Sequence, residues 1–301
     1  MLLDTPSLYF RAFFGIPESI KAPDGSPINA VRGLIDMIAT LVRQHSPAEL
    51  AATMDADWRP AFRVAAIPTY KAHRVAHGNT EEIPDTLVPQ VAIIEEVLDA
   101  LGIARLESPG YEADDVIGTL THQAAGRGDG AVDIVTGDRD LFQLVDDARP
   151  VRVLYTARGI RNLQIVDEAF VTAKYGIPGR AYADFATLRG DPSDGLPGVA
   201  GVGEKTAAAL ITRFGSLGAL IEALDAGETD GFPAGSRTKL SAARDYLRAA
   251  PAVVAVAPDA PLPAADLALP AKPRDPEALV RLADRYGLDS PLNRLLDVLG
   301  S

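Results

Sequence analysis

With 301 residues, of which 47% are hydrophobic and 23% charged, the chain has the size of one large or two modest globular domains and is not a disordered polymer. It has no cysteine, which excludes disulfides, thiolate metal sites and cysteine nucleophiles and fits a reducing compartment such as the cytoplasm. The formal net charge of −12 argues at first sight against a nucleic-acid partner.

The first residues, MLLDTPSLYFRAFF, carry Asp4 and Arg11 and lack a basic leader, so we expect no signal peptide. No apolar run reaches the length of about 18 residues that a membrane span needs, so we expect no membrane partner.

The first half alternates short apolar runs with helical stretches, which predicts an α/β fold with a mostly parallel central sheet and flanking helices. We expect strands at 1–3, 49–54, 133–136 and 151–155, and helices at 29–44, 87–101 and 113–125, the last ending at Gly126. The first three strands end at or just before an acid, namely Asp4, Asp55 and Asp138. Ligands gather beyond the carboxyl ends of parallel strands, so these acids are expected to point into one crevice.

From about residue 167 the pattern changes to short helices separated by glycine turns, which predicts a small all-helical second domain over 167–301 after an α/β domain over 1–166. Seven prolines and many alanines between 251 and 276 predict a segment that runs extended over the surface. Two amphipathic stretches, 277–286 and 292–299, are expected to pack back on the body.

Nine acids stand out: Asp4, Asp55, Glu112, Asp114 and Asp115 in YEADD, Asp138 and Asp140 in TGDRD, and Asp191 and Asp194 in GDPSD. Each motif alone could be a helix cap or a turn. Together, carboxylates this dense repel one another and require bound cations or raised pKa values. Without these nine negative charges the net charge of −12 would become −3, so the acidity indicates a metal site and does not argue against DNA.

Assembled in this order over about 200 residues, the motifs resemble the bacterial 5′-nuclease family of 5′–3′ exonucleases and flap endonucleases, which includes the amino-terminal nuclease domain of bacterial DNA polymerase I. The likeness covers Asp4 followed by Phe10 and Arg11, then FRVAAIPTYKAHR, YEADDVIGTL, TGDRDLFQLV and LRGDPSDGLPGVAGVGEKTA. No polymerase segment follows, so we expect a stand-alone member. Two departures are Thr5 where the family usually has glycine, and Gly195 where it usually has asparagine; both Gly and Asn tolerate left-handed backbone angles.

The resemblance implies a helical arch at about 70–90 and a helix–three-turn–helix element at about 196–214. It also implies two or more Mg²⁺ or Mn²⁺ ions, which would activate a water and stabilise an in-line phosphoryl displacement. One metal site would use Asp4, Asp55, Glu112, Asp114 and Asp138, and the neighbouring site would use Asp115, Asp140, Asp191 and Asp194.

The same resemblance implies how DNA is held. Lys71 and Arg74, in a Tyr-Lys-x-x-Arg motif, would assist catalysis together with Arg11, although a solvated basic face is the simpler alternative. Phe10 would stack on a base freed from the duplex, unless it is a core residue. The remaining implied DNA contacts are Arg63, Tyr70, Gly198, Gly201, Gly203, Lys205 and Thr206, with K⁺ on the carbonyls of the glycine turn and helix-terminal amides on a phosphate.

The implied function is a structure-specific 5′ nuclease that acts as a cytoplasmic monomer on DNA with 5′ flaps or 5′ ends, by two-metal-ion catalysis, in primer removal and repair. Two alternatives stay open. One is a catalytically silent module that binds branched DNA, and the other is a ribonuclease of the related PIN type.

Overall fold

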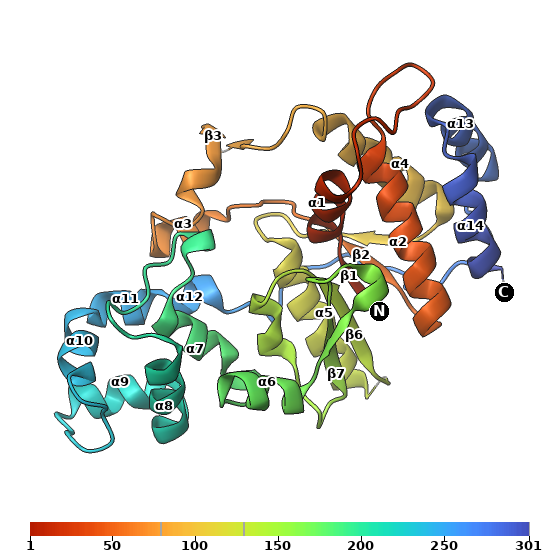
Figure 1. Ribbon diagram of the computed structural model, residues 1–301. Coiled ribbons are helices and arrows are strands. Elements are labelled where there is room, and N and C mark those ends of the chain that lie inside the picture. Colours follow the sequence, from red (N-terminus) through yellow and green to blue (C-terminus); the bar gives the residue numbers. More distant parts are fainter. Residues whose placement is uncertain (79, 129, 301) are drawn as a thin grey trace.

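The computed structural model describes residues 1–78, 80–128 and 130–300 and has a six-stranded sheet at its centre. In spatial order the strands are β5 (Ala104–Leu106), β2 (Ala51–Thr53), β1 (Leu2–Asp4), β6 (Val132–Thr136), β7 (Val151–Tyr155) and β8 (Gln164–Val166). All neighbouring strands pair in parallel except β7 and β8, which are antiparallel. The expected mostly parallel sheet with flanking helices is confirmed (Figure 1).

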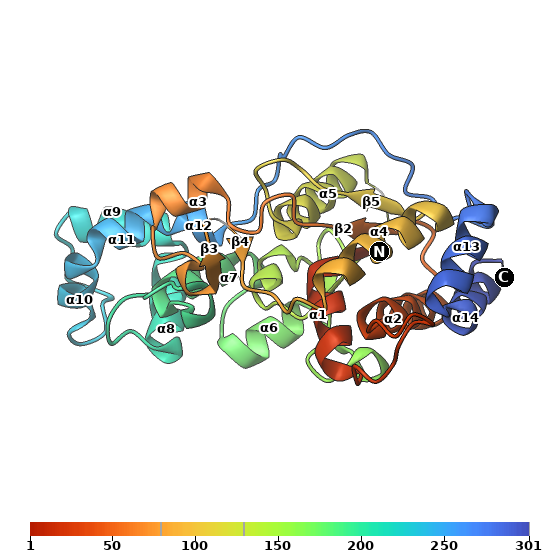
Figure 2. The same ribbon diagram turned by 90° about the horizontal axis from the view of Figure 1, so that it is seen from above.

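Helices cover both faces of the sheet, because successive side chains of a strand point to opposite sides. Leu2 packs in the core that includes α5 (Ala113–Arg127), whereas Leu3 packs with α1 (Thr5–Gly15), α2 (Asn29–His45) and α4 (Val88–Leu101). At the C-terminus, α13 (Pro276–Tyr286) packs on α4 and α14 (Asp289–Leu299) packs on α2. Figure 2 shows α2, α13 and α14 together at one end of the molecule.

A helical unit follows β8 and lies at the opposite end of the molecule (Figure 1). Its helices are α6 (Glu168–Tyr175), α7 (Tyr182–Arg189), α8 (Glu204–Phe214), α9 (Leu217–Asp225), α10 (Ser236–Ala242), α11 (Arg244–Ala249) and α12 (Pro251–Val254). Phe142 and Tyr182 join the unit to the sheet through an edge-to-face ring contact with centroids 5.4 Å apart. The predicted small all-helical domain is confirmed, although α13 and α14 pack on the helices beside the sheet.

No single helix in the described ranges is long and apolar enough to cross a membrane. Among the described residues, α8 and α9 together have that length and apolar composition, but they are bent by 80° relative to each other.

The segment between α12 and α13 runs extended along the edge of the sheet, as its prolines predict. The backbone N–H of Leu50 donates to Leu267 at 2.8 Å, and the hydroxyl of Ser108 donates to the carbonyl of Pro261 at 2.8 Å. The expectation was wrong only at its start, where Pro251–Val254 forms α12. Proline fits the first turn of a helix because its missing N–H has no partner there anyway.

The part of the stretch over 70–90 that precedes α4 is not the helical arch that the resemblance implied; it follows α3 (Ala61–Ala66). It holds a short 3₁₀ turn (Ala72–Arg74) and an antiparallel hairpin of β3 (Val75–His77) and β4 (Thr80–Glu81); Asn79 lies outside the described residues. Gly78 with a φ of +62° and the following proline at Pro84 disfavour a continuous helix. Figure 1 shows this segment crossing from the side of the helical unit to α4, so it spans the molecule as an arch without being helical.

Helix α5 passes the glycine at which it was expected to end. Gly126 lies inside the helix, which continues to Arg127 and is capped by Gly128 in the left-handed region at a φ of +70°. A glycine weakens a helix by about 1 kcal/mol but does not by itself end it. Other short 3₁₀ turns are Asp140–Leu144, Ile160–Asn162, Gly179–Ala181 and Pro192–Asp194.

Candidate active site

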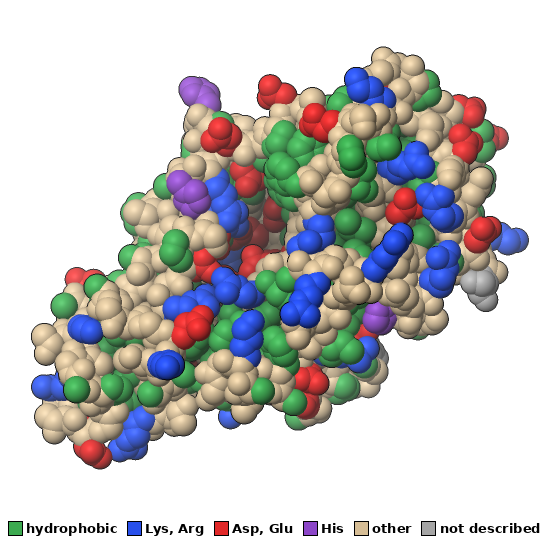
Figure 3. All heavy atoms as spheres, viewed as in Figure 1, with side chains coloured by type: hydrophobic (Ala, Val, Ile, Leu, Met, Phe, Trp, Pro, Cys, Tyr) green, Lys and Arg blue, Asp and Glu red, His purple; other side chains and the backbone are tan. Residues whose placement is uncertain are grey.

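Acidic side chains converge at the carboxyl edge of the sheet. Asp4 ends β1, Asp55 follows β2 and Asp138 follows β6, and β1 pairs in parallel with both of the other strands. The N-terminus of α5 adds Glu112 and Asp114. All five line one cavity of about 220 Å³. Figure 3 shows acidic side chains inside the hollow between the two halves of the molecule.

Asp4 is held in place by two hydrogen bonds but remains costly to ionise. The hydroxyl of Thr136 donates to its Oδ2 at 2.5 Å, and the backbone N–H of Ser7 donates to its Oδ1 at 3.2 Å. Burial nevertheless raises the pKa of Asp4 to about 7, and repulsion by Asp138 and Asp55 adds to this shift. A nearby cation would favour the charged form and return the pKa toward its ordinary range.

Asp55 and Asp114 experience the same two effects. Asp55 accepts a hydrogen bond of 2.7 Å from the backbone N–H of Ala113 in the first turn of α5, yet burial raises its pKa. Burial, followed by repulsion from Asp4 and Asp138, raises the pKa of Asp114 well above its ordinary value. The cavity thus concentrates carboxylates in an environment where each disfavours the charge of the others.

A second group of acids lies next to this cavity, in the turn after β6 and in GDPSD after α7. Burial raises the pKa of Asp140 well above its ordinary value, and repulsion from Asp138, Asp194 and Asp191 contributes further. Burial also raises the pKa of Asp194. Asp138 therefore interacts with both groups. Five acids thus line the cavity and three lie beside it, whereas the division of these acids between two bound ions stays a prediction.

The chemistry of these donors fits a hard divalent cation. Asp140 Oδ1 is buried and, within the described part of the chain, has no hydrogen-bond partner. No three acidic or histidine side chains among the described residues are placed to hold one ion between them. Mg²⁺ keeps several waters and takes only one or two carboxylates directly, so this arrangement suits ions bound partly through water.

Asp115, predicted as a ligand of the second ion, belongs to neither group. It is fully buried, and each of its carboxylate oxygens accepts a hydrogen bond of 2.7 Å from the guanidinium of Arg63. It also accepts the backbone N–H of Glu112 at 3.1 Å, in a capping box at the start of α5. Neighbouring positions on a helix are rotated by about 100°, so Asp114 faces the cavity and Asp115 faces Arg63. The predicted role of Asp115 is corrected accordingly.

Arg63 and Tyr70 also differ from their predicted role as DNA contacts. Their exposed fractions are only 2% and 4%. The hydroxyl of Tyr70 donates to Glu112 Oε2 at 2.7 Å, and Arg63 donates to Glu112 as well. Both side chains are therefore internal, and in this structure they act on Glu112 and not on a ligand in solvent.

Lys71 and Arg74, by contrast, line the acidic cavity, and their part in catalysis stays a prediction. The ammonium of Lys71 donates to Glu112 Oε1 and to the carbonyl of Trp58, and Arg74 donates to Asp194 at 3.0 Å. Although burial works against its charged form, Glu112 raises the pKa of Lys71 well above its usual value. Lys71 thus stays cationic at neutral pH beside the carboxylates.

The two other candidates on α1 are placed differently. Phe10 lines the cavity, and its ring stacks on that of Phe14 with centroids 6.4 Å apart and planes 10° from parallel. Arg11 is half-buried beside the turn at Gly137 and outside the cavity lining. The structure therefore places Phe10, but not Arg11, where a molecule in the cavity would meet it.

Trp58 and Glu81 line the cavity but were not predicted as site residues. Glu81 comes from β4, and burial raises its pKa. No sequence signal marked Glu81, because the hairpin that turns it toward the cavity lies in the stretch that was expected to form a helical arch. Trp58 is the only tryptophan of the chain, which makes it a useful local probe.

The glycine turn of the helical unit brings two backbones together. Gly198 has a φ of +63°, and a Cβ there would lie 2.5 Å from the carbonyl oxygen of Arg189. Gly201 has a φ of +73°, and its carbonyl accepts a hydrogen bond of 2.9 Å from the ammonium of Lys239. The first turn of α8 then carries the last predicted residues, with Gly203 at its N-cap, Lys205 exposed and Thr206 half-buried.

Gly195, the departure from the family pattern, contacts the base of the arch. Its φ is +72°, and a Cβ there would lie 2.3 Å from the carbonyl oxygen of Thr69. The Thr69 hydroxyl donates to the Gly195 carbonyl at 3.0 Å, and the N–H of Lys71 donates to the carbonyl of Asp194 at 2.9 Å. The absence of a side chain at Gly195 thus permits this close approach.

We expect Gly195→Ala to lower the free energy of unfolding by about 1–3 kcal/mol more than Gly25→Ala does, because only the first adds a steric clash. Gly25 is a matched control, since it has a φ of +88° with open space around it and so carries only the backbone strain. Urea unfolding of both variants measures the difference. Equal losses would contradict the close contact with Thr69.

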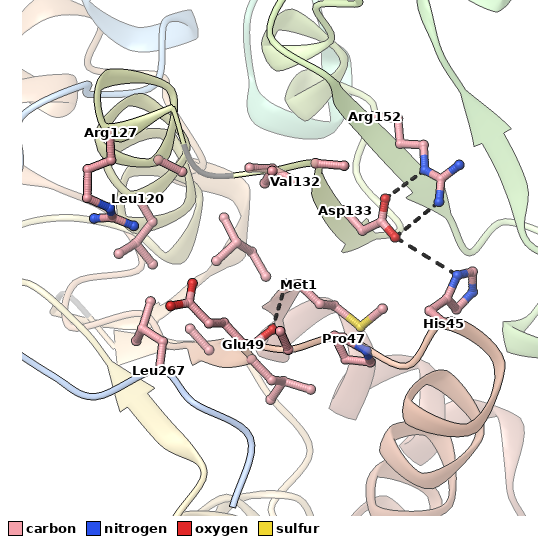
Figure 4. A pocket seen from close by; sticks show the side chains of 17 residues that line it. Met1, His45, Pro47, Glu49, Leu120, Arg127, Val132, Asp133, Arg152 and Leu267 are labelled. Carbon is pink, nitrogen blue, oxygen red and sulfur yellow. Dashed lines mark hydrogen bonds and ion pairs between the residues drawn. The ribbon is translucent and has the colours of Figure 1, made fainter.

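A larger cavity of about 610 Å³ lies at the opposite, amino edge of the sheet (Figure 4). Three of the titratable side chains that line it contact one another. Asp133 accepts from Arg152 at 2.6 Å and lies 3.9 Å from Nδ1 of His45. None of the predicted site residues, all of which are described, lines it. Cavity size alone therefore does not identify the site here.

Comparison with known proteins agrees with this fold. Residues 1–176 match the model of the 5′–3′ exonuclease N-terminal resolvase-like domain, and residues 177–277 match that of the 5′–3′ exonuclease C-terminal SAM fold. A 5′–3′ exonuclease of Streptomyces coelicolor is 60% identical over 304 residues, which cover 99% of each chain. The chain belongs to the 5′–3′ exonuclease family, an enzyme family.

Two further relatives show how far the likeness extends. DNA polymerase I of Mycobacterium bovis is 47% identical over 227 residues, which cover 75% of this chain and 24% of the polymerase. The T5 D15 protein, solved in a crystal grown with metal ions, superposes with a TM-score of 0.65 at 17% identity and covers 99% of this chain and 98% of its own. At that identity the T5 structure shows a shared fold.

Proposed function

We propose that this protein is a structure-specific 5′ nuclease that hydrolyses DNA phosphodiesters at 5′ ends and 5′ flaps with two or more divalent cations. The observation that carries the proposal is the gathering of every predicted acid except Asp115 in and beside one cavity, with Lys71 and Arg74 at the same place. The match to the 5′–3′ exonuclease family supports the same reaction class.

We assign each residue a role from its position at the cavity. Mg²⁺ or Mn²⁺ held by the two acid groups would supply an activated water and neutralise charge on the phosphate. Lys71 and Arg74, already cationic beside the acids, would stabilise charge that develops on the scissile phosphate. Phe10 is placed to stack on a base that enters the cavity. No histidine among the described residues lines the cavity, so we assign no general base from the chain.

The helical unit would hold the duplex by its phosphates. The amides of the first turn of α8 follow the glycine turn, and such a helix N-terminus favours an anion. Lys205 is exposed there and adds a phosphate contact that reads no base. We propose K⁺ on the turn carbonyls as a further bridge to DNA. We also propose that the protein acts as a cytoplasmic monomer in primer removal and repair.

Cleavage of 5′-flap, 5′-recessed and single-stranded DNA, with EDTA, Mg²⁺ or Mn²⁺, tests this function. We expect the 5′-flap DNA and the 5′-recessed duplex to be cut from their 5′ ends, and only when a divalent cation is present. Binding of branched DNA without cutting under any cation would favour the silent module, and preferential cutting of RNA flaps would favour the ribonuclease.

For Lys205→Ala we expect weaker DNA binding that does not depend on sequence, with the slope of log affinity against log salt reduced by about one. Binding to a nicked duplex at several salt concentrations, with Ca²⁺ in place of Mg²⁺, measures the slope. Lys272→Ala is the control, because Lys272 is an exposed lysine in the extended segment after the helical unit. An unchanged slope for Lys205→Ala would mean that this helix terminus does not contact phosphate.

A further inference from the structure

The guanidinium of Arg63 is saturated with hydrogen bonds inside the protein. A guanidinium has five N–H donors. Nε donates to the carbonyl of Val253 at 2.9 Å, and Nη2 donates to the carbonyl of Ala255 at 3.4 Å and to Asp115 at 2.7 Å. Nη1 donates to Asp115 at 2.7 Å and also to Glu112. No donor of this side chain is left for DNA.

Through these bonds Arg63 joins three segments that are far apart in the sequence. It projects from α3, just before the base of the arch. Its carboxylate partners stand at the N-terminus of α5, and its carbonyl partners belong to α12 and the residue that follows it. Helices α3 and α12 lie side by side in both ribbon views (Figures 1 and 2). Arg63 thus ties the arch, the acidic cavity and the end of the helical unit together.

Glu112 connects this hydrogen-bond network to the cavity. It accepts hydrogen bonds from Arg63 and Tyr70 on Oε2 and from Lys71 on Oε1. Both Glu112 and Lys71 line the cavity, whereas Arg63 does not. The position of Lys71 at the cavity therefore depends on a carboxylate whose orientation Arg63 helps to set.

Arginine suits this place better than lysine would. Its planar fork meets both oxygens of Asp115 while still reaching Glu112, a geometry that an ammonium cannot reproduce. Loss of one partner from a buried ion pair leaves an uncompensated charge, which is strongly unfavourable. In this protein the uncompensated charges would be two carboxylates next to an already acidic cavity.

We propose that Arg63 is a positioning residue that holds Glu112 and, through it, Lys71 in the geometry used for phosphodiester cleavage. The inference rests on the proposed nuclease function. It differs from the DNA contact that the sequence predicted for Arg63, because the side chain acts entirely from within the fold.

The test compares Arg63→Lys with Arg59→Lys. Arg59 is a matched control, since it is near in sequence and its side chain donates, among the described residues, to the backbone carbonyls of Tyr70 at 2.6 Å and Pro68 at 2.9 Å and to no carboxylate. For Arg63→Lys we expect kcat on a 5′-flap substrate to fall about 10–100-fold, the range typical for residues that orient metal-site ligands, with KM unchanged. Arg59→Lys should stay close to the wild type.

A second readout needs no cleavage. Trp58 lines the cavity, so its fluorescence in the free protein reports a Mg²⁺ titration. We expect the midpoint for Arg63→Lys to rise about 10–100-fold. Asp115→Asn should move both readouts in the same direction, and the double variant should lose less than the sum of the two single changes. If Arg63→Lys does not fold, Asp115→Asn carries the test alone.

Wild-type kcat and an unchanged Mg²⁺ midpoint in Arg63→Lys would overturn the proposal. A rise in KM with kcat unchanged would also overturn it, because that result would make Arg63 a DNA contact. If the wild-type protein itself leaves flap DNA uncut, the proposed function fails, and the Trp58 titration still decides whether Arg63 orders the acidic cavity.

Discussion

Asp138→Asn is expected to abolish cleavage while DNA affinity stays close to that of the wild type. Asp138 interacts with both acid groups, since it contributes to the raised pKa values of Asp4 and Asp114 on one side and of Asp140 and Asp194 on the other. Removal of its charge weakens both places at which a cation would bind. We expect kcat to fall about 10³-fold or more. This loss is at least as large as the loss of kcat when an enzyme loses one hydrogen-bond donor that stabilises charge in the transition state.

Single-turnover cleavage of a 5′-flap substrate and a separate binding assay in Ca²⁺ measure the two effects. Asp259→Asn is the control, because it removes the same charge from an exposed position in the extended segment. Turnover at the wild-type rate in Asp138→Asn would contradict the assignment. A parallel loss of DNA affinity would mean that Asp138 acts in binding and not only through metal.

The convergence of the acids could be predicted because it follows from simple rules. Short apolar strands that each end at an acid bring those acids to one edge of a parallel sheet, and β1, β2 and β6 do so. Helices α2 and α4, with long apolar periodicity, begin and end within one residue of their expected bounds. The antiparallel strand β8 and the edge strand β5 were not predicted.

Other features depend on tertiary contacts that no local pattern carries. The pair Asp114 and Asp115 reads as two equivalent acids, and only the position of Arg63 from another helix separates the cavity-lining residue from the buried one. The position of Glu81 in the cavity likewise could not be predicted, because it depends on the β3–β4 hairpin and on the path of the arch over the cavity. The motif spacing thus identified the acids, whereas the side chains that contact them could be found only from the three-dimensional structure.

The metal-free protein is expected to lose stability as the pH rises from about 4 to about 8 because of Asp4. The pKa of this group is about 7 in the folded protein against an ordinary value of 3.8. Between these values the folded state keeps a proton that the unfolded state has released, so the free energy of unfolding falls with rising pH. This loss in the free energy of unfolding is absent below the ordinary pKa of Asp4 and complete above its pKa in the folded protein. It amounts to at most about 4 kcal/mol.

Asp4→Asn isolates this effect, because the amide keeps the shape of the side chain and does not titrate. In EDTA the wild type should become progressively less stable than Asp4→Asn between pH 4 and pH 8, as urea unfolding would show. Charge effects far from Asp4 are common to both proteins and cancel in the difference. The charge of Asp4 also helps to raise the pKa of Asp114, so this neighbour adds to the difference in the same direction. A difference that does not change with pH would contradict the shifted pKa of Asp4.

Mg²⁺ should reverse the order of the two proteins at pH 8. An ion that binds only the folded state stabilises it in proportion to the logarithm of its concentration over the dissociation constant, and it also favours the charged form of Asp4. The wild type should therefore gain stability on addition of Mg²⁺ while Asp4→Asn gains little. The charge that destabilises the empty fold would then be the one that holds the ion, and equal gains in both proteins would show that Asp4 does not take part in holding it.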